Sequence, residues 1–139
     1  MSDKINPFEK KKKGVFFFKS SNPYEFYDLL NGKNMDDKQD VWGTLIFPEN
    51  AKKPCPLIIP IHGSAGLREG HHTHMVNLLD AGFAIFRIHH FESRGVISIV
   101  ENQTEVTLAS MITDAFRALT LVSKHPDIDS DKIGIMGWS

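Results

Sequence analysis

The sequence predicts an α/β fold of three layers, with helices on both faces of a mostly parallel, twisted sheet. Three largely apolar runs predict buried strands at Leu57–Ile61, Phe83–Ile88 and Lys132–Met136. Segments with helical apolar spacing separate these runs. An alternation of strand and helix implies parallel pairing with right-handed crossovers, and hence helices on both faces.

Two more strands are expected before this alternating part. Val15–Lys19 and Val41–Phe47 are rich in β-branched and aromatic residues, and we expect them to pair at one edge of the sheet. The polar segment Ser20–Gln39 between them contains Asn-Pro and Asn-Gly turn signals. A short helix is predicted around Tyr24–Leu30.

Two helices are expected between the buried strands. Met75, Leu78 and Leu79 share one helical face, and Gly82 stands at the position of a C-cap. The clearest helix is predicted over Thr104–Ser123. Its apolar face comprises Leu108, Met111, Ile112, Ala115, Leu119 and Val122.

Length and composition favour one globular domain of 139 residues, with residues 1–13 as a flexible tail. The formal net charge of −1 argues against nucleic acid or an anionic membrane as partner. A single cysteine, Cys55, excludes an internal disulfide. The apolar run Val15–Phe18 is too short for a signal peptide, and no run is long enough to span a bilayer, so a cytoplasmic location is expected.

Three special segments follow the three predicted parallel strands. They are His62–Gly66, His89–Gly95 and Gly137–Ser139. Ligands of parallel sheets bind at the carboxyl ends of the strands. Glycines also follow strands simply to form turns, but three such segments at one edge indicate a site.

The last segment suggests a catalytic nucleophile. Gly137-Trp138-Ser139 is the first half of the pattern Gly-x-Ser-x-Gly, placed directly after a buried strand. In such an elbow, glycines permit a tight turn that exposes the serine hydroxyl above the sheet. We therefore predict Ser139 as the nucleophile.

From Val41 to Ser139 the sequence resembles the α/β-hydrolase superfamily, and within it the dienelactone hydrolase-like family. The resemblance implies hydrolysis of an ester, lactone or related acyl bond of a small molecule through an acyl-enzyme, with no cofactor. The matching segments are Pro56–Gly66, Ala81–Ala84, Phe91–Val96, Asp114–Leu119 and Ile133–Ser139.

The resemblance also implies roles for single residues. Ser139 is the nucleophile, and Ser64 donates its backbone N–H to the oxyanion, with Ala65 as the alternative donor. His62 supports this loop. The family takes its second oxyanion donor, its triad acid and its triad histidine from positions beyond Ser139. We therefore expect the amino-terminal part of a serine hydrolase, a single incomplete domain that is inactive alone.

Other residues keep two interpretations. Arg94 either binds a substrate carboxylate or holds its own loop. Relatives often have aspartate at the position of His89, whose role stays open. Asp114 and Arg117, on the long helix, are expected to be structural.

Two alternative functions remain at this stage. A doubly wound module that binds phosphate through His62–Gly66 is one, although neither Gly-x-Gly-x-x-Gly nor Gly-Lys-Ser/Thr is present. A metal-binding domain is the other, because His71, His72 and His74 lie close together near Glu69. We expect no metal at this cluster, which reads more simply as a solvated loop and helix start. The sequence predicts no oligomeric state.

Overall fold

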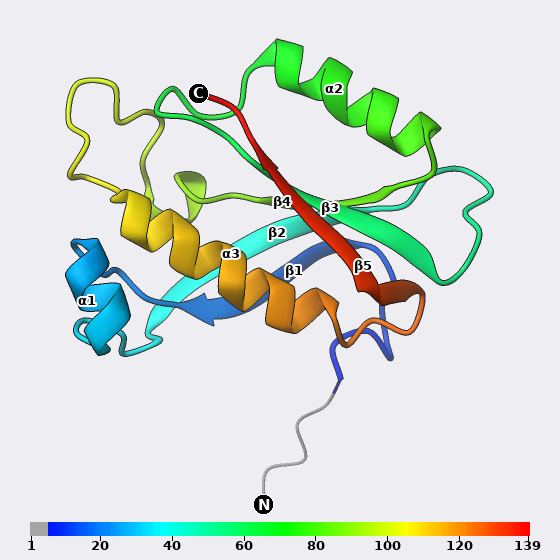
Figure 1. Cartoon of the computed structure of the whole chain (residues 1–139), viewed down its shortest axis with the longest axis horizontal. Coiled ribbons are helices and arrows are strands. Elements are labelled where there is room, and N and C mark those ends of the chain that lie inside the picture. The colour runs from blue at the N-terminus through cyan, green and yellow to red at the C-terminus, as the bar shows by residue number, and fades with distance from the viewer. Residues whose placement is uncertain (1–5) are drawn as a thin grey trace, which may run out of the picture.

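The computed structural model describes residues 6–139, which fold around one five-stranded sheet (Figure 1). The strand order across the sheet is β1-β2-β4-β3-β5. The elements are β1 (Gly14–Ser20), α1 (Phe26–Asn31), β2 (Gln39–Ile46), β3 (Cys55–Ile61), α2 (Glu69–Asp80), β4 (Ala84–Ile88), the 3-10 turn η1 (Glu92–Arg94), α3 (Leu108–Val122) and β5 (Ile128–Gly137).

The sheet is mixed, and its parallel part is formed by β3, β4 and β5, the three later strands of the chain. β3 pairs in parallel with both β4 and β5, as the three apolar runs predict. β1 pairs antiparallel with β2 at one edge, which confirms the expected pairing, and β2 continues antiparallel to β4. Pro60 lies within β3 opposite Met136, and the irregularity in this ladder falls earlier, between Cys55 and Leu57.

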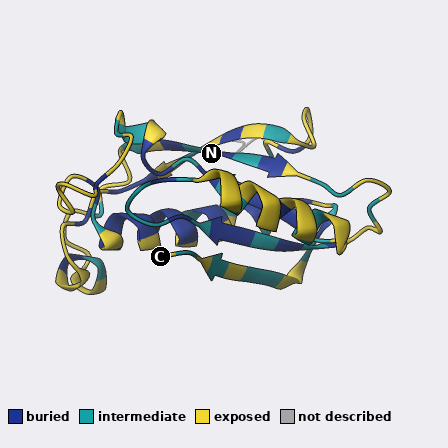
Figure 2. Ribbon diagram, turned by 90° about the horizontal axis from the view of Figure 1, so that it is seen from above, coloured by how far each residue is buried: buried dark blue, intermediate teal, exposed yellow. Residues whose placement is uncertain are grey.

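Helices α2 and α3 cover opposite faces of the sheet. The connection β3-α2-β4 crosses the sheet in one direction, and β4-α3-β5 returns past β3 in the other. Right-handed crossovers in opposite directions place their helices on opposite faces, which gives the three expected layers (Figure 1). α2 presents a largely exposed outer surface, whereas much of α3 is buried (Figure 2).

The clearest predicted helix begins later than its spacing suggests. α3 starts at Leu108, not at Thr104, because Thr107 is the N-cap and its hydroxyl accepts the Ser110 N–H at 3.1 Å. Both the N–H and the hydroxyl of Thr104 instead donate to the Asn102 side chain. Such local bonds compete with the helix, so Thr104 belongs to the preceding turn.

The expected flexible tail over residues 1–13 differs from the structure where the structure describes it. Residues 1–5 lie outside the described part. Phe8 is fully buried, with its ring centroid 4.8 Å from that of Phe16 and 4.5 Å from that of His125. His125 also holds the Lys12 carbonyl at 2.8 Å. One buried aromatic ring and one buried imidazole thus fix residues 6–13 against the core.

No helix in residues 6–139 combines the length and the apolar character needed to cross a bilayer.

Candidate active site

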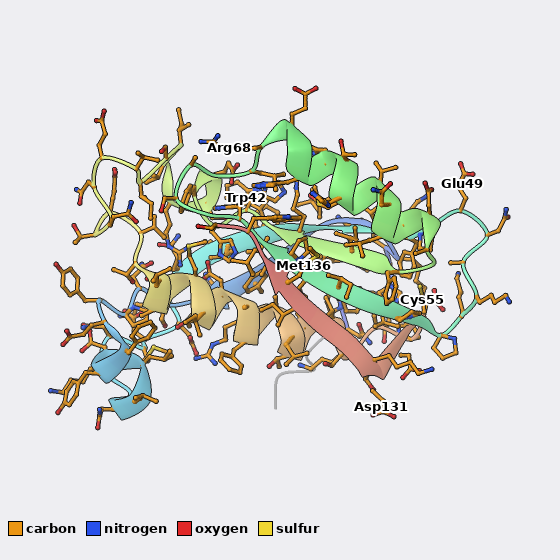
Figure 3. The ribbon with its side chains drawn as sticks, turned by 45° about the horizontal axis from the view of Figure 1, so that its top comes forward. Trp42, Glu49, Cys55, Arg68, Asp131 and Met136 are labelled. Atoms are coloured by element: carbon orange, nitrogen blue, oxygen red, sulfur yellow. The ribbon has the colours of Figure 1, made fainter. Side chains whose placement is uncertain are left out.

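The carboxyl ends of β3 and β5 bring Ser139 and the loop after His62 together. The two strands are parallel neighbours with Ile61 opposite Gly137. The Trp138 N–H donates to the Ile61 carbonyl at 3.0 Å and extends this pairing to the residue before Ser139. Cys55 begins β3 and therefore lies at the other end of the strand from this site, as Figure 3 shows.

Gly63 is the point at which the loop touches the chain end of β5. A Cβ atom on Gly63 would lie only 2.8 Å from the carbonyl carbon of Ser139, a distance at which something must shift. Gly66 closes the loop with a positive φ of 78°, and its N–H donates to the Gly63 carbonyl at 3.0 Å. Glycine is therefore required at both positions, at Gly63 because there is no room for a side chain and at Gly66 because of its positive φ.

The Gly63 carbonyl fixes the direction of the next amide. It accepts from Gly66 N–H and from His62 Nδ1–H, the latter at 2.9 Å. In a trans peptide the N–H points away from the carbonyl of the same unit, so the Ser64 N–H is turned to the opposite side. The Ser64 carbonyl is held in turn by the Ile99 N–H at 2.8 Å. His62 thus orients the amide that the sequence singles out as an oxyanion donor.

His62 is buried, with 6% of its surface exposed. Burial lowers the pKa of its imidazole, against a smaller opposing effect of the Gly63 carbonyl. The ring is therefore neutral near pH 7, with its proton on Nδ1 because a carbonyl only accepts.

Two pockets border Ser139. One, of about 310 Å³, is mainly apolar and lies between the loop, β5 and α3, where Ile99, Leu108 and Met111 line it. The other, of about 330 Å³, is lined by Ser64, Ala65, Arg68 and His71. Ser64 borders both pockets and Ala65 only the second, so both predicted donors share a pocket with Ser139.

A stacked pair of rings ties the start of α2 to the residue before Ser139. The His71 and Trp138 rings stack with centroids 4.3 Å apart and planes 12° from parallel. His71 Nδ1 accepts the Arg68 N–H at 3.1 Å, so the neutral ring carries its proton on Nε2. Burial and the nearby Arg68 lower the pKa of His71.

Asp114 forms a buried polar network that sequence reasoning missed. Its carboxylate is fully buried and accepts from both Arg94 terminal nitrogens, at 2.7 and 2.9 Å. It also accepts from His90 Nδ1 at 2.8 Å and from the Ser20 hydroxyl at 2.5 Å. Burial opposes ionisation of Asp114, but the contacts with Arg94 and His90 outweigh burial, and the pKa is lowered. The carboxylate of Asp114 on α3 therefore joins three other parts of the chain, namely the end of β1, the turn that follows β4, and η1.

The network assigns Arg94 to its own loop. Besides Asp114, its guanidinium donates to the Asn22 side chain and to the Ser21 and His90 carbonyls. These contacts engage all three guanidinium nitrogens, which favours the second interpretation over binding of a substrate carboxylate. Asp114 and Arg117 both make structural contacts, since Arg117 pairs with Asp37 at 3.0 Å.

The three histidines of the candidate metal cluster lie within α2 and point to different surroundings. His72 and His74 are exposed, and His71 stacks on Trp138. Among residues 6–139 no group of three or more histidine, cysteine or acidic side chains is arranged to hold a metal ion. The alternative of a metal-binding domain therefore has no ligand set in this part of the chain.

Comparison with known proteins identifies the fold. No protein-family model matches the chain, and no curated protein is significantly similar in sequence. A protein from Klebsiella pneumoniae assigned as a dienelactone hydrolase matches with a TM-score of 0.59 and 16% identity, over 89% of this chain and 50% of that one. Est1E from Butyrivibrio proteoclasticus matches with a TM-score of 0.59 and 21% identity, over 91% and 40%.

A second Est1E structure, with ferulic acid bound, matches with a TM-score of 0.55 and 26% identity over 72% of this chain and 39% of that one. The chain therefore has the α/β-hydrolase fold. Its neighbours are hydrolases and esterases of the dienelactone hydrolase type, which confirms the resemblance drawn from the sequence at the level of fold. The chain spans half or less of the length of these structures.

Proposed function

We propose that this chain is part of a serine hydrolase that cleaves carboxylic ester, lactone or related acyl bonds of small molecules. The single observation that carries the proposal is the meeting of Ser139 with the loop after His62. Gly63 lies against Ser139, and the carbonyl contacts of Gly63 turn the Ser64 N–H outward. A nucleophile beside a fixed amide donor is what acyl transfer requires.

The proposed reaction begins with attack of the Ser139 oxygen on the acyl carbon. The carbonyl oxygen becomes an oxyanion, which the Ser64 N–H, or in the alternative the Ala65 N–H, stabilises. The serine proton passes to the base of the full-length gene product and on to the alcohol oxygen as the bond between that oxygen and the acyl carbon breaks, which leaves the acyl-enzyme. In a lactone the alcohol stays tethered to the acyl group. Water then adds to the acyl carbon, the bond to the serine oxygen breaks, and the acid and the serine hydroxyl are released. His62 acts on these steps only through the direction it gives to the Ser64 amide.

No histidine of residues 6–139 forms a hydrogen bond with Ser139, although His62 and His71 line the pockets beside it. His62 donates to the Gly63 carbonyl, and His90 donates to the buried Asp114 carboxylate. A serine without a base is a weak nucleophile. We therefore propose that residues 1–139 alone do not turn over esters, and that the acid and base of the full-length gene product come from other segments.

A serine-directed phosphonate tests the proposal on the full-length gene product. We expect one covalent adduct at Ser139, located by mass spectrometry, and loss of both adduct and ester turnover in Ser139→Ala. Ser130→Ala is the matched control, because Ser130 is exposed near the start of β5, away from the pockets beside Ser139, and it should be labelled like the unchanged protein. Labelling at another serine, with turnover retained in Ser139→Ala, would refute the assignment.

A further inference from the structure

A polar cavity lies beneath the loop after His62, between α2, the end of β4 and η1. Its volume is about 190 Å³, and its polar lining consists of His62, His72, Arg87, His89 and Glu92. At about 30 Å³ for each liquid water, this volume accommodates several waters or one tetrahedral oxyanion. We call it the Arg87 cavity.

Arg87 brings to this cavity a positive charge that has no ion-pair partner among residues 6–139, and Glu92 is the one acidic side chain in the lining. The Arg87 Nε atom is buried and has no hydrogen-bond partner within the same residues. Its one contact with a side chain is a long one, from Nη2 to His89 Nε2 at 3.4 Å. Glu92 also lines the cavity, but its side chain is 56% exposed and lies 3.8 Å from His89 Nδ1. Partly buried charges ordinarily have a partner of opposite sign, so Arg87 calls for an anion.

His62 contributes a buried acceptor to the same cavity. Its Nδ1–H is used by the Gly63 carbonyl, and its Nε2 is buried without a partner in the described chain. Because burial lowers the pKa of His62, Nε2 carries a lone pair and no proton near pH 7. An anion without a hydrogen would meet this lone pair unfavourably.

We propose that the Arg87 cavity binds a phosphate group that carries at least one proton, either free phosphate or a small phosphomonoester. A phosphate oxygen accepts from Arg87 Nε–H, and the P–OH group donates to His62 Nε2. The ligand therefore satisfies both buried orphan atoms, whereas sulfate satisfies only the first because it has no hydrogen at neutral pH.

The proposed site goes beyond the acyl hydrolase function and does not depend on it. The two share His62, which lines the Arg87 cavity and holds the Gly63 carbonyl through Nδ1. Bound phosphate would therefore contact the residue that orients the Ser64 amide.

Calorimetric titration and thermal unfolding of the full-length gene product, at about pH 6.5, test the site. The probes are inorganic phosphate, methyl phosphate and sulfate at matched ionic strength, since ionic strength alone shifts charged interactions. We expect saturable binding of phosphate at least about fivefold tighter than that of sulfate, since one buried hydrogen bond is worth that much. Methyl phosphate binds like phosphate if the cavity admits an ester, and more weakly if the natural ligand is the free ion.

Variants separate this site from general attraction of anions. Arg87→Met should weaken phosphate binding by about tenfold or more, as expected for loss of a charge-assisted hydrogen bond. Arg87→Lys keeps the charge but loses the Nε donor, and should also weaken binding. Arg117→Met removes the same charge from α3, away from the cavity, and should bind phosphate normally. The proposal is overturned if phosphate shows no saturable binding, if sulfate binds equally well, or if Arg87→Met binds phosphate unchanged.

Discussion

The buried face of α3 carries polar side chains among apolar ones such as Met111, Ala118 and Val122, whereas its other face exposes large apolar side chains. Toward the sheet, the helix buries the polar side chains of Ser110, Thr113 and Asp114. Away from it, Leu108 and Phe116 are 65% and 59% exposed. Hydropathy alone would not predict the polar side chains on the buried face.

The inner face is stable because every buried polar group finds a partner. Asp114 accepts four hydrogen bonds, Thr113 donates to the Ala109 carbonyl at 2.8 Å, and Ser110 donates to the Pro23 carbonyl at 3.2 Å. The outer face instead forms an apolar groove of about 210 Å³ with β5, where Ile135 is 64% exposed. The difference teaches that α3 can bury polar side chains beside its apolar ones where their hydrogen bonds are satisfied.

Removing the centre of the inner face should have the largest effect. Asp114→Ala leaves Arg94 and His90 buried without their shared acceptor, and breaking a buried ion pair costs about 3–5 kcal/mol. We expect a loss of this order in the free energy of unfolding of the full-length gene product, measured in denaturant. Asp80→Ala, an exposed acidic residue at the end of α2, is the control and should change stability by less than about 0.5 kcal/mol. Equal effects of the two variants would disprove a central role for Asp114.

Acid should lower the stability of the fold, because buried histidines that are neutral in the folded chain become protonated in the unfolded one. Burial lowers the pKa values of His62, His89 and His125 below their ordinary 6.5. The unfolded chain then binds more protons than the folded one, so stability is full above pH 6.5 and falls as the pH drops below it. The lowered pKa of Asp114 adds a further loss only below its ordinary 3.8.

His125 offers a way to check this sign. Its Nε2–H donates to the Lys12 carbonyl and its Nδ1 accepts the Asp127 N–H, so protonation of Nδ1 breaks one of two bonds. Melting temperatures between about pH 7.5 and pH 5.5 should therefore decline less steeply in His125→Gln than in the unchanged protein. A melting temperature that rises on acidification would contradict the assignment of these histidines as buried neutral groups.

The sequence predicts the order of strands and helices well because each strand has its own apolar run. Pairing of β1 with β2 and the meeting of β3 with β5 both follow from it. It does not predict the Asp114 network, because Ser20 comes from β1 and His90 and Arg94 come from the segment His89–Gly95, both far from Asp114 in the sequence. One signal was present: Asp114 lies three residues after Met111 and four before Ala118, on the face that is buried. An acidic residue on an apolar face indicates a buried cation as partner.

The start of α3 and the burial of the amino-terminal segment were also not predictable from the sequence alone. Local side-chain bonds of Thr104 and Thr107 decide where α3 begins, and several similar residues there offer competing caps. Burial of Phe8 depends on His125, more than a hundred positions away in the sequence. Composition alone describes residues 1–13 as a tail, because the charges of Lys10–Lys13 outweigh one aromatic ring.

The outer face should respond much less than the inner one. Phe116→Ser exchanges two residues of similar helix propensity at a position that is 59% exposed. In the chain of residues 1–139 we expect the free energy of unfolding to change by less than about 1 kcal/mol and self-association in sedimentation to decrease, because an exposed apolar patch promotes association. Ala118→Ser on the buried face is the comparison and should cost more, since Ala118 is fully buried. A larger loss in Phe116→Ser than in Ala118→Ser would show that the outer face is packed.

The smallest effect is expected where a charged pair on α3 is exposed. Arg117 and Asp37 form an ion pair of 3.0 Å, the same kind of contact as Arg94 with Asp114, but their side chains are 35% and 45% exposed. Water screens such a pair, so Arg117→Ala should change stability by about 0.5 kcal/mol or less. A double-mutant cycle with Asp37→Ala measures the pair directly, beside the cycle of Arg94→Ala with Asp114→Ala. A coupling energy for the exposed pair as large as that of the buried pair would mean that burial is not what distinguishes the two, and the contrast between the faces of α3 would need another cause.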